Sequence, residues 1–278
     1  MQYVKAIEGE MLKPTRGLLV RNWSEDIVNL VQFPRTHTIV DVSPFCVKLE
    51  TWLRITEIKY KNVSNEFSKS SAKGQVPFIE LNGRQFADSN FIIDHLRSHF
   101  KLKIDENLSD KEKAEFRALT ILIEESLFRY FQLKNLLHAQ GYGRHTPEEI
   151  EEITKKDLTA LSIHLGDKSF MFGDIPSTLD ATAFGHLVQF TDTPLTSDKI
   201  KTFMEQNTPN LIEFIKRIKE RFWPDWIQIC ETLALNPEDL KKDEEQKKEE
   251  IKENNAENVE VTSTSPPPTD TANVPIQA

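Results

Sequence analysis

The sequence predicts a mixed α/β half followed by an all-helical half. Short apolar runs of strand character occur only in the first part of the chain, on either side of one strong helix pattern. Beyond them, hydrophobic residues recur at helical spacing until the composition turns acidic and then rich in Ser, Thr and Pro. We therefore expect an irregular leader at 1–24, an α/β domain at 25–104, a helical domain at 105–236 and a disordered tail at 237–278.

The distribution of charge argues against a nucleic-acid partner. The 278-residue chain has a net charge of −9. Eleven acids and five lysines after residue 237 account for −6 of this, which leaves −3 for the rest of the chain. Nucleic-acid-binding domains usually concentrate basic residues on one surface. We therefore expect no binding to nucleic acid.

The sequence also gives no sign of a membrane span or a secretory signal. The longest uncharged run, 181–191, is about half as long as a spanning helix requires. Glu8 and Glu10 occupy positions that are apolar in a signal peptide. Cys46 and Cys230 are too few for a disulfide framework and are expected to be free thiols. These features predict a cytoplasmic protein, and the seven histidines show no spacing that would predict a metal site.

The α/β half begins with a strand, a helix and a second strand. Residues 26–33, "DIVNLVQF", form the short apolar run of a buried strand, and 59–63 alternate as strand residues do. Between them, Ser43 and Pro44 suit the N-cap and the first position of a helix expected over 44–56. The polar stretch after the second strand holds at most a short helix.

A β-hairpin follows. Residues 76–81 have strand character, Asn82 and Gly83 favour a tight turn, and 85–87 form the returning strand. Pro77 is unusual inside a strand because it lacks an N–H donor. A cis proline at the sheet edge would account for it and would expose the neighbouring backbone to a ligand.

The last element of this half is a helix. Asp88 and Ser89 are able to cap it, and Phe91, Ile92 and Leu96 supply its apolar spacing. The order is then strand, helix, strand, hairpin and helix, which is a thioredoxin-like topology.

Four helix patterns make up the second half. Thr146 and Pro147 suit the cap and first position of the second helix. Ser177 and Asp180 form an S-x-x-D capping box before the third. We expect these helices at 109–138, 146–165, 172–190 and 208–223.

Four motifs in this order resemble the glutathione transferase superfamily. They are "SPF" at the first helix, "QVPF" before the hairpin, "DS" at the start of the helix that ends the α/β half, and "GDIPSTLD" in the helical half. The stretches "SPFCVKLETWLR", "KGQVPFIELNG" and "STLDATAFGHL" are similar, more narrowly, to the failed axon connections homologue family. That family groups with nematode cadmium-responsive proteins and, more distantly, with the metaxins. The resemblance implies cytoplasmic or mitochondrion-associated members and a role in axon development. A location peripheral to the mitochondrial outer membrane is therefore the alternative to the cytoplasm.

The superfamily resemblance implies a glutathione site. Ser43 aligns with the serine whose hydroxyl donates a hydrogen bond to the glutathione sulfur, and the alternative is a simple N-cap. Val76 and Pro77 resemble the backbone clamp for the cysteinyl part, and a structural proline is the alternative. Asp88 and Ser89 resemble the pair that holds the γ-glutamyl end, although Asp-Ser is also an ordinary helix cap.

The remaining candidates have structural explanations that compete with functional ones. Cys46 occupies the second cysteine position of a C-P-F-C motif, where a helix N-terminus lowers a thiol pKa. It also shares a helical face with Leu49 and Leu53, which predicts core packing instead. Ser177 and Asp180 resemble a folding element and are interpreted as structural.

Two functions remain open at this stage. The first is a serine-type glutathione transferase that conjugates glutathione, its co-substrate, to electrophiles. The second is a glutathione-transferase-like protein with weak or no turnover that binds protein partners through the loop 34–42 or the tail. A weaker third hypothesis is a redox sensor that uses Cys46. A homodimer is compatible with all three.

Overall fold

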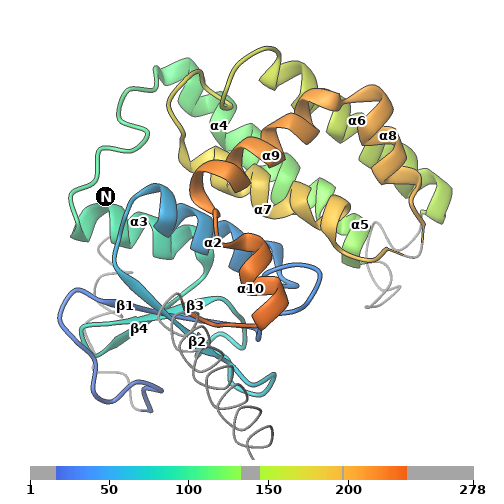
Figure 1. Ribbon diagram of the computed structural model, residues 1–278. Helices are drawn as coiled ribbons and strands as arrows, with labels where there is room; N and C mark the ends of the chain where they lie inside the picture. The colour runs from blue at the N-terminus through green and yellow to red at the C-terminus, as the bar shows by residue number, and fades with distance from the viewer. Residues whose placement is uncertain (1–16, 133–144, 196, 237–278) are drawn as a thin grey trace, which may run out of the picture. The chain divides into compact units, whose positions relative to one another are not determined.

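The computed structural model describes residues 17–132, 145–195 and 197–236 (Figure 1). All of these residues belong to one compact unit. The predicted tail and residues 1–16 of the predicted leader lie outside the described residues.

A four-stranded mixed sheet forms the centre of the α/β half. Strand β1 lies parallel to β2 and antiparallel to β3, which pairs antiparallel with β4, so the spatial order is β2-β1-β3-β4. This arrangement, with one helix between β1 and β2 and another after β4, confirms the predicted thioredoxin-like topology. The strands are β1 (Val28–Gln32), β2 (Tyr60–Ser64), β3 (Phe78–Leu81) and β4 (Arg84–Ala87).

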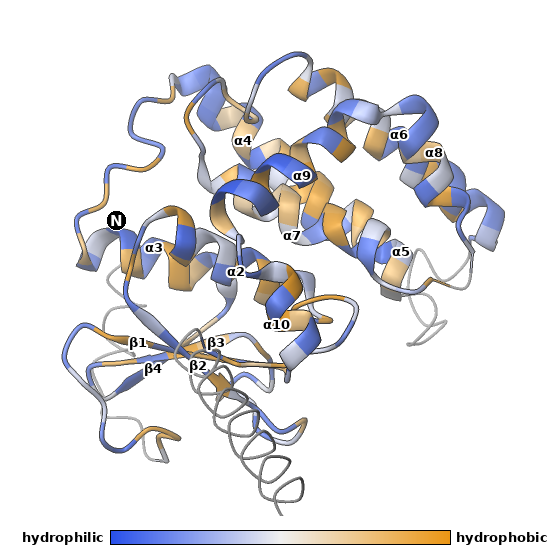
Figure 2. Ribbon diagram, viewed as in Figure 1, coloured by the Kyte–Doolittle hydropathy of each residue, from blue (hydrophilic) through white to orange (hydrophobic). Residues whose placement is uncertain are grey.

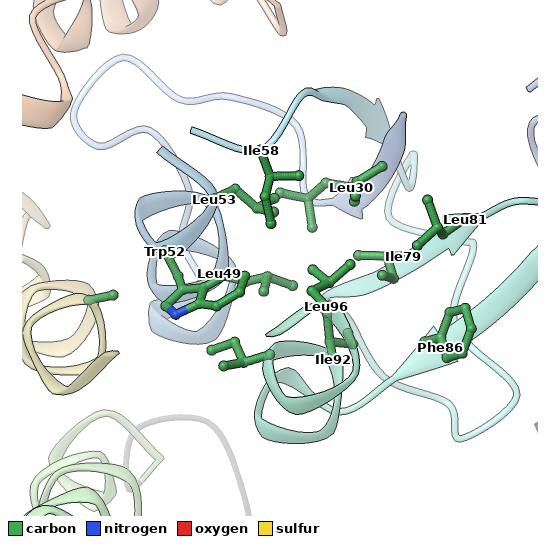
Figure 3. Close-up of a cluster of buried hydrophobic side chains, with 13 residues drawn as sticks. Leu30, Leu49, Trp52, Leu53, Ile58, Ile79, Leu81, Phe86, Ile92 and Leu96 are labelled. Atoms are coloured by element: carbon green, nitrogen blue, oxygen red, sulfur yellow. The ribbon is translucent and has the colours of Figure 1, made fainter. Parts of the chain in front are cut away.

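Helices α2 (Pro44–Ile55) and α3 (Ser89–His99) cover one face of this sheet (Figure 1). Each begins as the local sequence dictates, with Ser43 as N-cap of α2, Pro44 at its first position, and Asp88 as N-cap of α3. Apolar residues of both helices pack with apolar residues of the sheet in a buried core (Figure 3). Members of this core include Leu30, Leu49, Trp52, Leu53, Ile79, Ile92 and Leu96.

The hairpin differs slightly from the expectation. Strand β3 begins at Phe78, so Pro77 lies just before the strand and removes no ladder donor from it. The Val76–Pro77 peptide bond is cis, as expected. The polar stretch 65–73, where at most a short helix was expected, forms turns.

The helical half contains more elements than the sequence predicted. The long helix expected at 109–138 is interrupted by a π-helical segment, in which Phe128 N–H bonds to Ile123 C=O, and residues 133–144 lie outside the described residues. The sequence predicted neither of two short helices, α8 (Lys199–Asn207) and α10 (Trp226–Thr232). The elements are α4 (Asp110–Ile121), η1 (Leu122–Leu127), α5 (Arg129–Gln132), α6 (Pro147–Leu165), α7 (Thr178–Asp192), α8 (Lys199–Asn207), α9 (Pro209–Phe222) and α10 (Trp226–Thr232).

Helix α7 is the central helix of this half. Every residue from Thr178 to Phe190 is buried, which explains the long uncharged run in the sequence, and Figure 2 shows the contrast with the more hydrophilic α6 and α8. Gly185 lets α7 approach α2 closely, because a Cβ there would lie 2.5 Å from the Pro44 carbonyl oxygen and 2.7 Å from the backbone nitrogen of Lys48. No helix within the described ranges is long and apolar enough to cross a membrane.

Candidate functional site

The register of the sheet brings the predicted site residues to one end. Phe78 pairs with both Val31, near the end of β1, and Ala87, the last residue of β4. Pro77 therefore lies beside the end of β1, and Asp88, which follows β4, lies at the same end. The backbone N–H and C=O of Val76 have no hydrogen-bond partner within the described part of the chain. This backbone is therefore free to pair with an extended ligand.

The N-terminus of α2 also lies at this end of the sheet, because the Cys46 thiol is within hydrogen-bonding reach of the Phe33 backbone just after β1. Ser43 is half-buried, and its Oγ accepts the Cys46 N–H at 3.4 Å. Its own N–H donates to Asp41 Oδ1 at 2.7 Å. Capping uses the oxygen of the Ser43 hydroxyl as an acceptor, so its proton is available for donation, and the Cys46 thiol is one group within hydrogen-bonding reach of this side chain. The two interpretations of Ser43 therefore do not exclude each other.

Cys46 lies in a very different environment from Ser43. It is fully buried, and burial raises the pKa of its thiol well above the usual value. The carboxyl of Asp41 beside it is also fully buried, and burial likewise raises the pKa of Asp41 well above its usual range. A thiol with a raised pKa is a poor nucleophile because little thiolate forms. This geometry favours the packing interpretation of Cys46.

At the N-terminus of α3, Asp88 caps the helix and keeps one hydrogen-bond acceptor unused. Asp88 has a φ of 79°, and its Oδ1 accepts the N–H groups of Asn90 and Phe91 at 3.0 and 3.2 Å. Its second carboxylate oxygen has no partner among the described residues. Asp88 is half-buried, whereas Ser89, the first residue of α3, is buried. A helix N-terminus, which is the kind of position that attracts anions, and a carboxylate oxygen without a partner among the described residues therefore lie side by side.

A buried lysine that the sequence did not reveal completes this site. Lys48 Nζ donates to Ser89 Oγ at 3.2 Å, Asn90 Oδ1 at 2.7 Å and Glu124 Oε1 at 2.5 Å. Glu124 Oε2 accepts Asn90 Nδ2 at 2.7 Å. Glu124 belongs to the π-helical segment η1, and such segments often occur at functional sites. The network ties the N-terminus of α3 to the helical half.

A second buried network lies further along α2, around Glu50. Arg35 binds its carboxylate with two hydrogen bonds of 2.8 Å, and both side chains are fully buried. Arg54 lies 3.6 Å from Glu50 and also pairs with Asp225 of the helical half. The carboxylate accepts three further bonds, from Gln32, Tyr60 and Asn62.

The loop 34–42 is held between this network and the helical half. Arg35 also donates to the Leu235 carbonyl at 3.1 Å, and His37 Nδ1 donates to the Cys230 carbonyl at 2.9 Å. The Gln189 side chain of α7 donates to the Asp41 carbonyl at 3.2 Å. The segment that leads to Ser43 is therefore anchored at several points.

The other predicted residues lie away from this end of the sheet. Asp180 accepts hydrogen bonds from Ser177 N–H, Ser177 Oγ and Met171 N–H at 2.6 to 2.7 Å, at the start of α7. Burial raises the pKa of Asp180 to about 6. These bonds tie the preceding loop to α7, as a structural element does. No group of His, Cys, Asp and Glu suited to a metal ion occurs among the described residues.

The comparisons with known proteins agree with this architecture. Family models of the glutathione S-transferase N-terminal and C-terminal domains match residues 44–140 and 154–218. The chain is 34% identical to "Failed axon connections" of Drosophila melanogaster, over 86% of this chain and 69% of that protein. The chain belongs to the failed axon connections family. This confirms the predicted family and its glutathione-transferase-like character.

Other relatives are less similar in sequence to this member of the failed axon connections family. It is 27% identical to the isoprene-epoxide–glutathione S-transferase of a Rhodococcus strain, over 66% of this chain and 94% of that enzyme. It is 23% identical to mouse Metaxin-2, over 73% of this chain and 91% of that protein. The predicted relationship to the metaxins is thereby confirmed.

Solved structures show the fold. A glutathione transferase family member from Pseudomonas fluorescens with two glutathione bound has a TM-score of 0.55 at 14% identity, over 70% of this chain and 89% of that one. A glutathione S-transferase from Methylobacterium radiotolerans in complex with glutathione sulfonate has a TM-score of 0.54 at 16% identity, over 72% of this chain and 94% of that one. At these identities the likeness concerns the fold alone, and it confirms the predicted fold class.

Proposed function

We propose that this member of the failed axon connections family binds glutathione at the end of its sheet where β1, β3 and α3 meet. The observation that carries the proposal is the unused hydrogen-bonding capacity gathered there. It comprises a free oxygen of Asp88, the N-terminus of α3 with Ser89 and the unpaired backbone of Val76. The Ser43 hydroxyl, which caps α2, lies at the same end of the sheet.

Each of these groups suits one part of the tripeptide. The Asp88 carboxylate would accept from the γ-glutamyl ammonium, and the Ser89 hydroxyl with the N–H groups of α3 would hold the neighbouring carboxylate. The Val76 backbone would pair with the cysteinyl backbone as a neighbouring strand does. The Ser43 hydroxyl would then donate to the sulfur, which favours thiolate over thiol.

Weak or absent turnover is proposed as the accompanying property, together with the predicted role in axon development. The Drosophila relative, at 34% identity, is named for axon connections, whereas the relative named as a transferase is 27% identical. A second candidate, an active serine-type transferase, is favoured by the position of the Ser43 hydroxyl at the N-terminus of α2, where a thiolate is stabilised. The cytoplasmic location, its mitochondrial-surface alternative, the protein partners and the homodimer stay predictions.

Calorimetric titration of glutathione tests binding. We expect the wild-type protein to bind, and Asp88→Asn to bind at least several-fold more weakly because the ammonium loses its counter-charge. Asparagine caps helices about as well as aspartate, so the stability of this variant should change little. Ser43→Ala should bind glutathione but lose any ability to lower its thiol pKa, which the thiolate absorbance in the ultraviolet reports.

Two outcomes would contradict the proposal. Failure of the folded wild-type protein to bind at millimolar glutathione would show that the helix ends are caps and nothing more. Equal affinity of wild type and Asp88→Asn would show that glutathione binds elsewhere. Turnover of an electrophile that survives in Ser43→Ala would remove the serine mechanism from the second candidate.

A further inference from the structure

The ammonium of Lys48 uses all of its hydrogen-bonding capacity on three side chains. It has three N–H donors and no acceptor. Its three acceptors are Glu124 Oε1, Asn90 Oδ1 and Ser89 Oγ, at 2.5, 2.7 and 3.2 Å. The Lys48 side chain is fully buried, so water does not compete for these bonds. The position of the ammonium is therefore fixed by its partners.

This arrangement fixes the direction of the Ser89 hydroxyl. The Ser89 oxygen accepts from Lys48, so its own proton must point away from the ammonium. No acceptor for that proton occurs within the described residues. Ser89 is the first residue of α3, and its hydroxyl therefore presents a donor at the same helix end as the N–H groups of the first turn.

Glu124 holds the other side of the network. One of its oxygens pairs with Lys48, and the other accepts the Asn90 amide at 2.7 Å. The Asn90 side chain is thus bound at both ends, by Lys48 and by Glu124. Burial lowers the pKa of Lys48, and the nearby Glu124 carboxylate opposes this shift and favours the ammonium. Each member of the pair keeps the other in place.

We propose that Lys48 and Glu124 are positioning residues that orient the Ser89 hydroxyl as a hydrogen-bond donor to the α-carboxylate of the γ-glutamyl group. This inference rests on the proposed function, since it assigns a role within the glutathione site. Because Glu124 lies in the helical half, that half takes part in recognising a ligand held by the α/β half. An ion pair that only joined the two halves would not discriminate between ligands.

The test compares two ligands on the same sample. Glutathione is titrated beside γ-aminobutyryl-cysteinyl-glycine, which lacks only the α-carboxylate of the γ-glutamyl residue. The ratio of the two dissociation constants does not depend on the fraction of protein that is folded. We expect the wild-type protein to favour glutathione by roughly tenfold or more, as hydrogen bonds to a charged group do.

Lys48→Met and Ser89→Ala should each bring this ratio several-fold closer to one. The double variant should show the same ratio of dissociation constants as Ser89→Ala alone, because Lys48 acts through Ser89. Lys155→Met is the matched control: it removes a lysine that pairs with Glu151 and Glu152 on α6, and it should leave the ratio unchanged. Should Lys48→Met fold poorly, the double replacement Lys48→Met with Glu124→Leu removes the whole pair and should give the same ratio.

Two results would overturn the inference, and they are distinguishable. If Lys48→Met weakened both ligands by the same factor, the pair would be structural while the proposed glutathione site stood. If the wild-type protein bound neither ligand, the proposed function would fail and the inference with it.

Discussion

Helix α2 buries two opposite charges only two residues apart, and they are satisfied in different ways. The Glu50 carboxylate is surrounded by donors, with two bonds from Arg35 and further ones from Gln32, Tyr60 and Asn62. The ammonium of Lys48 is also satisfied, but one of its acceptors is a hydroxyl whose proton has no acceptor among the described residues.

Under the proposed function, this difference separates a structural network around Glu50 from a ligand-binding one around Lys48. The Glu50 network leaves the buried atoms Gln32 Oε1, Arg35 Nε and Arg54 Nε without partners, but none of the three belongs to a helix N-terminus. We therefore interpret it as a network that serves the fold. A spare donor at a helix N-terminus is the usual form of an anion site. Loss of Glu50 should therefore reduce the stability of the protein, and loss of Lys48 should change what it binds.

The largest expected effect is that of Glu50→Gln. It removes the counter-charge of the buried Arg35, and breaking a buried ion pair by removing one partner costs about 3–5 kcal/mol. Urea-induced unfolding at neutral pH measures this loss. Glu115→Gln is the control for the same chemical change on the surface, where Glu115 lies 3.7 Å from the exposed Lys111, and it should cost less than about 1 kcal/mol. Similar losses in the two variants would mean that the network contributes no more than a surface pair.

The acid dependence of stability sharpens the same comparison. Burial opposes the ionisation of Glu50, but Arg35 outweighs it and lowers the pKa of Glu50 from 4.5 to about 2. Because the folded-state value lies below the unfolded one, this carboxylate stabilises the fold above pH 4.5. As pH falls from about 4.5 to about 2, that contribution of about 3 kcal/mol is lost. Glu50→Gln should show a shallower fall over this range in unfolding experiments at stepwise lower pH, and an unchanged slope would contradict the assignment.

A smaller effect is expected where α7 packs against α2 beside Lys48. Gly185→Ala would place a Cβ 2.5 Å from the Pro44 carbonyl oxygen, so the helices must separate. Overpacking of this kind typically costs about 1–3 kcal/mol. In an exposed helix, a Gly→Ala change would stabilise the protein by about 1 kcal/mol. We therefore expect the melting temperature of Gly185→Ala to fall, where the same change at an exposed site would raise it. A raised melting temperature would show that the two helices have room to move apart.

The elements that the sequence predicted correctly are mostly marked by caps, turns and apolar spacing within a short stretch of chain. The cap at Ser43 and the apolar spacing after it predicted a helix over 44–56, and α2 spans Pro44–Ile55. The Asn82-Gly83 turn located the hairpin. Helix α8 was missed although Ile200, Phe203 and Met204 are spaced as helix residues, because three apolar positions in nine residues are a weak pattern.

The site was only partly visible because its polar partners lie far apart in the chain. Ser43, Asp88 and Ser89 occupy helix N-termini, and short motifs predict such positions. Lys48 and Glu124 are 76 residues apart, and a charged residue on a helix is usually solvated. Nothing in the local pattern distinguishes Lys48 from an exposed lysine, since its burial arises from the packing of α3 and α7 against α2.

Asn236 has a consequence for the solubility of the chain. Strand β2 is an edge of the sheet, and the Asn236 side chain accepts the Asn62 N–H at 2.6 Å and donates to the Asn62 carbonyl at 3.1 Å. An incoming strand from another molecule would need these same two backbone groups. The residues after α10 thus block the free edge with a single amide side chain. A chain cut before Leu235 would keep its core but expose an edge at which two copies are able to pair and aggregate.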